Sequence, residues 1–156
     1  MLKRFLASTL LVVSVSLSGI SSAQDTPSTV LNYEMAERAM AAALAEARAN
    51  NWNLAILITD HEGTPVMMHR MDGASLRNYQ IALAKAKVVI ETGLFSGEYG
   101  RRLEAGEIEE IEGGIHYAGG VPVMLNGEQI GAITASGARG SEDEQVSLAA
   151  AATIGN

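Results

Sequence analysis

The chain has 156 residues, a formal net charge of −7, and a composition that is 47% hydrophobic, 19% charged and 4% aromatic. This length corresponds to one ordinary domain, and the composition excludes a disordered, collagen-like or coiled-coil chain. The acidic charge argues against a nucleic-acid-binding protein, which needs a basic face, and the lack of cysteine excludes disulfides, thiolate metal sites and cysteine nucleophiles.

The first 23 residues have the pattern of a secretory signal peptide. Lys3 and Arg4 give a positive start, an apolar run follows, and small residues favour cleavage before Gln24. The apolar run is too short to cross a bilayer, which takes ~20 apolar residues, and no cysteine follows it for lipid attachment. We therefore predict a periplasmic or secreted protein without a stable membrane anchor. The predicted segments are a signal peptide at 1–23, a leader at 24–31 and a domain at 32–156.

Helical and strand patterns alternate along the domain. A first helix is predicted after Asn32, a residue type that caps helices, and its end is marked by Asn50 and Asn51. Asn126-Gly127, between two apolar runs, is the strongest hairpin signal of the chain. In chain order, the predicted elements are a helix between Asn32 and Asn50, strands 54–59 and 65–70, helices 75–91 and 96–105, strands 121–125 and 129–135, and a final helix opened by a capping box at Ser141-Glu142-Asp143-Glu144.

Strands joined as antiparallel hairpins, with helices packed over them, predict a layered α+β domain rather than a Rossmann unit. The helix at 75–91 is apolar on most of its circumference, so it is expected to face both the core and a subunit interface. The stretch 107–112 contains four glutamates and is predicted to be a solvated surface segment.

Two histidines are candidate ligands. His69 shares one face of its strand with Met67 and Met71, because side chains alternate along a strand. Such a face can hold a soft metal, give haem an axial ligand, or simply pack in the core. His116 precedes the glycine pair at 119–120, where backbone can approach a ligand closely, or it is an exposed loop histidine.

A polar cluster with a glycine lies at 70–74, between a predicted strand and a predicted helix. Arg70 can clamp a carboxylate or a haem propionate, or it can form a weak surface pair with Asp72. Lys85 interrupts an apolar helix face and points either to an interface edge or into a ligand site. The glycine clusters match no phosphate-binding fingerprint, and Ser136 lacks the nucleophile elbow of a hydrolase. The sequence therefore shows no nucleotide-binding fingerprint.

Seven short motifs span about residues 35–152. They are Thr59-Asp60-His61-Glu62-Gly63, Arg70-Met71-Asp72-Gly73-Ala74, Ala84-Lys85-Ala86, Gly119-Gly120-Val121-Pro122, the hairpin from Asn126-Gly127 to Ile130-Gly131-Ala132, its end Ala135-Ser136-Gly137, and the helix start Glu142-Asp143-Glu144. In this order and spacing they resemble the GlcG/HbpS-like (haem-degrading domain) family, which is related to the C-terminal domain of the PduO corrinoid adenosyltransferases.

The resemblance implies a profilin-like, three-layer α/β/α sandwich with a five-stranded antiparallel sheet, homo-oligomers, and binding of haem or a corrinoid-related ligand. The function it favours is an exported, oligomeric haem- or tetrapyrrole-binding protein, accessory to haem handling or to small-molecule catabolism. The alternative is an enzyme or accessory subunit that acts on a small organic acid or an aromatic metabolite.

The resemblance places the candidate site between the 70–74 turn and the 119–120 loop. The candidate residues are Arg70, Met71, Asp72, Gly73, Lys85, Gly119 and Gly120 for ligand binding, His69 and His116 as haem axial ligands, and Asp60 and Asp72 as acid–base groups for the alternative function.

Overall fold

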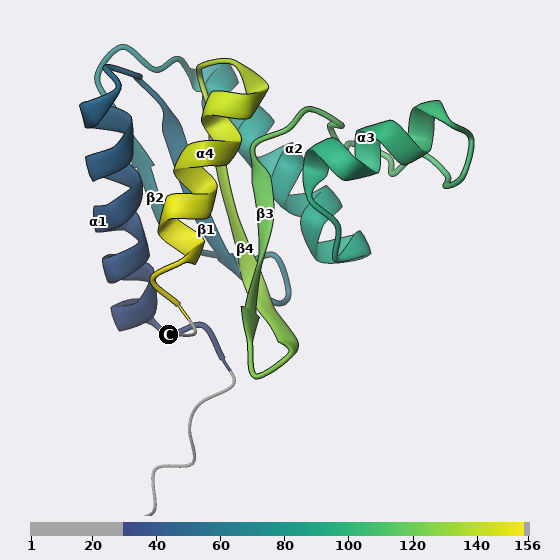
Figure 1. The fold of residues 1–156 in the computed structure, drawn as a ribbon, viewed down its shortest axis with the longest axis horizontal. Helices are drawn as coiled ribbons and strands as arrows, with labels where there is room; N and C mark the ends of the chain where they lie inside the picture. The colour runs from purple at the N-terminus through teal and green to yellow at the C-terminus, as the bar shows by residue number, and fades with distance from the viewer. Residues whose placement is uncertain (1–29, 155–156) are drawn as a thin grey trace, which may run out of the picture.

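The computed structural model describes residues 30–154, so the predicted signal peptide and nearly all of the leader lie outside the described residues. This part of the chain forms four helices and four strands (Figure 1). In chain order they are α1 (Tyr33–Ala49), β1 (Ala55–Asp60), β2 (Pro65–Arg70), α2 (Leu76–Thr92), α3 (Ser96–Glu104), β3 (Gly120–Leu125), β4 (Glu128–Ser136) and α4 (Gly140–Ala151). The predicted elements are thus confirmed in type and order. Between residues 30 and 154, no helix has the length and apolar character needed to cross a bilayer.

The four strands form one antiparallel sheet with the order β2-β1-β4-β3. The five-stranded sheet implied by the family resemblance is therefore wrong for the described residues. The segment 105–119, between α3 and β3, adds no strand, because its four glutamates and four glycines disfavour extended pairing and it folds into turns and bends. The centre of the sheet is the β1–β4 pair, in which Ala55 lies opposite Ser136.

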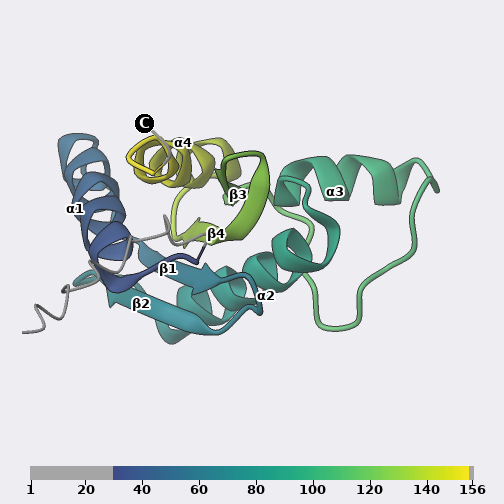
Figure 2. The same ribbon diagram turned by 90° about the horizontal axis from the view of Figure 1, so that it is seen from below.

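Helices cover both faces of the sheet and give three layers (Figure 2). α1 and α4 lie on one face, and α2 lies on the other. In β1, Ile56 and Ile58 join the core cluster formed with α1 and α4, whereas Leu57 packs against Ala82 and Ala86 of α2. A continuous aliphatic strand therefore fills both faces of the sheet. α3 lies beyond the β3 edge, beside the end of α2.

α4 begins at Gly140, and the predicted capping residue Ser141 lies inside the helix. The N-cap position is Arg139, whose backbone N–H donates to Oε2 of Glu142 at 3.0 Å. The prediction at Ser141 was wrong because the carboxylate of Glu142 accepts the N–H of Arg139, and the helix therefore starts two residues earlier than a cap at Ser141 would set it.

Candidate functional site

A groove of about 720 Å³ lies between α3, the segment 116–118 and the start of α4. Its lining residues are Phe95, Gly97, Glu98, Gly100, Arg101, Glu104, His116, Tyr117, Ala118, Gly140 and Glu144. A second hollow of about 360 Å³, on the α2 side of the same segment, is also lined by His116 and Tyr117. These two side chains therefore border both hollows.

The segment that carries His116 packs flush against α3. Gly97 and Gly100 lie one helical turn apart and face this segment. A methyl group at Gly100 would overlap the carbonyl oxygen of His116, and one at Gly97 would lie 2.9 Å from Cβ of Ala118. Glycine weakens a helix by about 1 kcal/mol relative to alanine, but here it permits a close approach that no other residue allows.

Two buried serines anchor the same loop. Oγ of Ser96 donates to the carbonyl oxygen of Tyr117 at 2.7 Å and accepts the N–H of Gly120 at 2.9 Å. Oγ of Ser147, on α4, donates to the carbonyl oxygen of Gly119 at 2.8 Å. The backbone from residue 117 to residue 120 is thus held by hydrogen bonds from two helices, next to the residue that carries the imidazole.

The groove offers aromatic surface next to the imidazole. Tyr117 is 58% exposed, and its ring meets that of His116 edge-on at a centroid distance of 5.1 Å. Phe95, at the start of α3, is 37% exposed on the same groove. Exposed aromatic side chains on a concave surface are typical of sites for flat, apolar ligands.

The charged side of the groove is formed by α3. Glu98 forms ion pairs with Arg101 and Arg102. The hydrogen bond from Arg102, together with the positive charge of both arginines, holds the pKa of Glu98 below its usual value. Glu98 and Arg101 both line the groove, and Arg101 is the lining residue of this group whose positive charge can meet an anionic ligand.

The two candidate histidines do not come together. His69 lies on β2 opposite Ile56 of β1, so it faces the layer that contains α1. Met67 and Met71 pack against the core on that side. Of the alternatives for the Met-His-Met face, this agrees with packing in the core. Residues 30–154 contain no cluster of three or more His, Asp or Glu side chains that could hold a metal ion.

The 70–74 turn and the 119–120 loop are not adjacent either. The 70–74 turn follows β2, and the 119–120 loop precedes β3. These are the two edge strands of the sheet, and β1 and β4 lie between them. At the usual strand spacing this separation is about 14 Å. The guanidinium of Arg70 donates to the carbonyl oxygen of Ala74, while Asp72 and Gly73 are exposed in the turn.

Asp60 and Asp72 also lie apart, at opposite ends of the β1–β2 hairpin. Oδ1 of Asp60 accepts the N–H groups of Glu62 and Thr64, each at 2.9 Å, and so closes the hairpin turn. Asp60 therefore stabilises the turn, as aspartate commonly does, and the two carboxylates form no acid–base pair.

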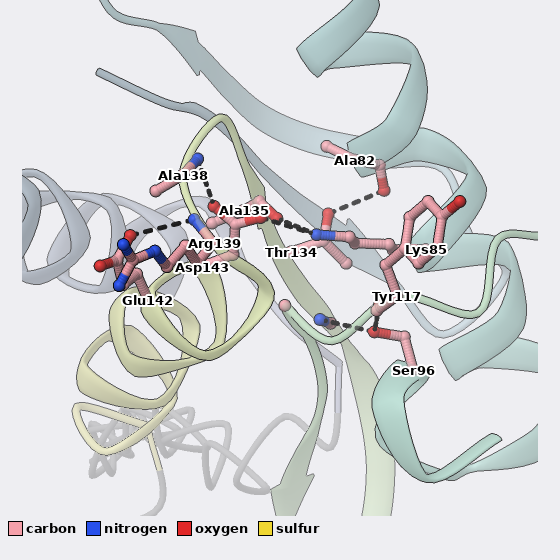
Figure 3. A network of polar contacts seen from close by, with 12 residues as sticks. Ala82, Lys85, Ser96, Tyr117, Thr134, Ala135, Ala138, Arg139, Glu142 and Asp143 are labelled. Carbon is pink, nitrogen blue, oxygen red and sulfur yellow. Dashed lines mark hydrogen bonds and ion pairs between the residues drawn. The ribbon is translucent and has the colours of Figure 1, made fainter. Parts of the chain in front are cut away.

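Lys85 is buried and paired inside the protein. Its Nζ donates to the carbonyl oxygen of Ala135 at 2.8 Å and to Oδ2 of Asp143 at 3.0 Å (Figure 3). The side chains of Lys85 and Asp143 are only 1% and 4% exposed. Burial lowers the pKa of Lys85 and raises the pKa of Asp143, because loss of hydration disfavours both charged forms; their mutual attraction opposes these shifts.

Gly119 packs directly on this ion pair. A methyl group at Gly119 would lie 2.5 Å from Nζ of Lys85 and 2.7 Å from Cβ of Asp143. On the other side of Asp143, Oδ1 accepts the N–H of Ala138 at 3.0 Å. The pair thus joins α2, β4 and α4 to the loop that carries His116.

Sequence reasoning did not identify Asp143 as the partner of Lys85, although a signal was present. Asp143 shares its helix face with Val146 and Ala150, both fully buried, and an acid on a buried face needs a partner. Arg101 gave no such signal, because its place in the groove depends on how α3 packs against residues 116–118.

A family model described as haem-degrading protein HbpS-like matches residues 31–152. The chain belongs to this HbpS-like family. Protein GlcG of Escherichia coli K12 is 33% identical over 117 residues, which cover 69% of this chain and 81% of that protein. The family assignment made from the sequence motifs is therefore confirmed.

Solved structures with the same fold include HbpS. The crystal structure of a double mutant of HbpS from Streptomyces reticuli has a TM-score of 0.76 at 30% identity, covering 94% of this chain and 100% of that chain. The crystal structure of a PduOC–haem complex has a TM-score of 0.68 at 21% identity, covering 80% of this chain and 95% of that chain. The second likeness concerns the fold alone.

Proposed function

We propose that this HbpS-like protein binds haem or a related tetrapyrrole in the groove beside α3, with His116 as the axial ligand. The observation that carries the proposal is the position of His116, whose backbone packs on Gly100 of α3 and whose side chain lines a groove of about 720 Å³. The family is described as haem-degrading, and one protein of the same fold was crystallised with haem.

The side chains of the groove fit a porphyrin in their chemistry. Tyr117 and Phe95 offer aromatic surface to its flat faces, and the guanidinium of Arg101 can hold a propionate. Glu104 and Glu144 on the same groove repel carboxylates, so we expect the propionates to point toward Arg101. When bound, haem supplies iron-centred chemistry, and the protein orients the ring and the imidazole.

Titration with haemin, followed by the Soret band, tests this site. We expect His116→Ala to shift the Soret maximum and weaken binding, because the imidazole is lost from the groove. The matched control is His69→Ala, on the face of β2 that packs toward α1, which should leave the spectrum unchanged. A wild-type protein without a Soret response would refute haem binding, and an unchanged spectrum for His116→Ala alone would refute the ligand assignment.

We also propose that the protein assembles through the outer face of α2. Leu76 is 66% exposed there, and a groove of about 490 Å³ along the same helix is lined in part by Leu83, Ala84 and Ile90. An exposed apolar surface of this kind favours association with a second copy. Light scattering should give a smaller particle for Leu83→Glu than for the wild type, and a monomeric wild type would contradict the proposal.

Export to the periplasm or to the medium is proposed from the pattern of residues 1–23. Sequencing of the exported protein should begin at or near Gln24. An intact Met1 on protein from the cytoplasm would contradict export. The alternative function, with Asp60 or Asp72 as the acid–base group beside Arg70, has less support, because Asp60 is held in a turn at the far end of the hairpin.

A further inference from the structure

A small hollow of about 210 Å³ has the Lys85–Asp143 pair in its wall. It lies between α2, the loop after β4 and Tyr117, and the other lining residues include Asn78, Ile81 and Ser136. Figure 3 shows Lys85 reaching from α2 toward β4, with Tyr117 on the same side of the sheet. The hollow has room for several water molecules or a small organic molecule.

The ammonium group of Lys85 has one donor that the described residues leave unused. A protonated lysine has three N–H donors, of which two are taken by the carbonyl oxygen of Ala135 and the carboxylate of Asp143. The third has no acceptor among residues 30–154, although the side chain is only 1% exposed. Because an unpaired buried donor is costly, the third N–H is expected to meet an oxygen in the hollow, either that of a water molecule or that of a ligand which displaces it.

The charges around the pair favour a neutral acceptor over an anion. Asp143 already neutralises Lys85, and the charges of Glu142 and Glu144 act on the same pair. A carboxylate or a phosphate would add a further negative charge beside an ammonium group that already interacts with the charges of Asp143 and Glu144. A carbonyl oxygen would accept the third N–H without this repulsion.

We propose that this hollow binds a small neutral aldehyde or ketone, whose carbonyl oxygen accepts a hydrogen bond from Lys85 and whose carbonyl carbon forms an imine with Nζ. Asp143 serves as the acid–base partner. The hollow borders the groove beside α3, with which it shares Tyr117 and Gly140, but its chemistry needs no haem.

The step balances within the pair and the ligand. Asp143 takes a proton from Lys85, the freed lone pair of Nζ forms the C–N bond, and the electrons of the C=O double bond move to oxygen. The oxygen leaves as water with two of the three ammonium hydrogens, so a protonated imine and the Asp143 carboxylate remain. Because burial lowers the pKa of Lys85 and raises the pKa of Asp143, proton transfer within the pair costs less than between the same groups in water.

Reductive trapping with propanal and cyanoborohydride at neutral pH, followed by peptide mass spectrometry, tests the proposal. Cyanoborohydride delivers a hydride to the imine carbon and leaves a stable propyl-lysine. The chain provides its own control, because Lys87 is two residues away on α2 and its side chain is 45% exposed. We expect propylation of Lys85 to be faster than that of Lys87, because burial lowers the pKa of Lys85 and the hollow holds the aldehyde next to its Nζ.

Two controls separate reaction in the hollow from reaction elsewhere. In denatured protein both lysines are exposed and should react at similar rates. Ile81→Trp, which fills the hollow, should slow propylation of Lys85 and leave Lys87 unchanged, with circular dichroism confirming the fold. Faster propylation of Lys87 than of Lys85 in the native protein would overturn the proposal and leave the pair a purely structural contact. Propylation of Lys85 that is unaffected by Ile81→Trp would also overturn it.

Discussion

Replacing Asp143 with alanine removes the counter-charge of a buried ammonium group. Lys85, which is 1% exposed, must then either stay charged without a partner or give up its proton, and both outcomes cost free energy of folding. Breaking a buried pair in this way costs about 3–5 kcal/mol, against a total stability of about 5–15 kcal/mol for a single domain. We therefore expect a large fall in the urea midpoint of Asp143→Ala.

The matched comparison is the exposed pair between Arg38 and Glu34 on α1. Its N–O distance of 3.1 Å is close to the 3.0 Å of the buried pair, but its side chains are 50% and 81% exposed. Glu34→Ala should cost less than about 1 kcal/mol. Urea unfolding, followed by far-UV circular dichroism and by the fluorescence of Trp52, measures both variants. The double variant Lys85→Met/Asp143→Ala should be more stable than Asp143→Ala, because no unpaired ammonium remains. If Asp143→Ala cost no more than Glu34→Ala, the reasoning from burial would be refuted.

Three further outcomes are expected around α3. Gly100→Ala should destabilise the fold by about 1–3 kcal/mol in urea unfolding, because the methyl group overlaps the carbonyl oxygen of His116; a gain of about 1 kcal/mol, typical of an unobstructed helical glycine, would contradict this contact. Arg101→Ala should weaken haem binding by about 1.5–3 kcal/mol in titrations, whereas Arg102→Ala, which removes no groove-lining side chain, should not. Because the pKa of Glu98 is depressed in the folded state, its contribution to stability is present at neutral pH and is lost as the pH falls through that folded pKa. Glu98→Gln should therefore unfold with a weaker dependence on acid pH, as measured by circular dichroism.

The helices and strands were predictable because their signals lie in neighbouring residues. Oδ1 of Asn32 accepts the N–H of Met35 at 2.9 Å, as its type and position suggested for the cap of α1. Asn126 and Gly127 adopt φ values of 53° and 84°, as the hairpin turn between β3 and β4 requires. The expected fifth strand came from the family resemblance, but the motifs that carry the resemblance leave out most of residues 105–119. The glutamates and glycines of that segment disfavour a strand, and the segment forms turns and bends instead.

The site was far less predictable, because its parts are distant in the sequence. The order β2-β1-β4-β3 places the 70–74 turn and the 119–120 loop at opposite edges of the sheet, and no local pattern encodes that order. Lys85 raised the question of a ligand or an interface, but its answer depended on Asp143, 58 residues further along the chain. The groove next to His116 depends on two glycines of α3 whose role is visible only once the helix is packed.

The two hairpins of the sheet are local structures, but the seam between them is not. β1 and β4 come from opposite ends of the described domain, so closing the β1–β4 seam costs chain entropy before its contacts are gained. The pair between Lys85 on α2 and Asp143 on α4 is likewise a long-range contact, because α2 follows the first hairpin and α4 follows the second. A contact made after the folding barrier slows unfolding without speeding folding. We infer that the buried ion pair forms late in this sense, so it is expected to lengthen the lifetime of the folded protein rather than to hasten folding.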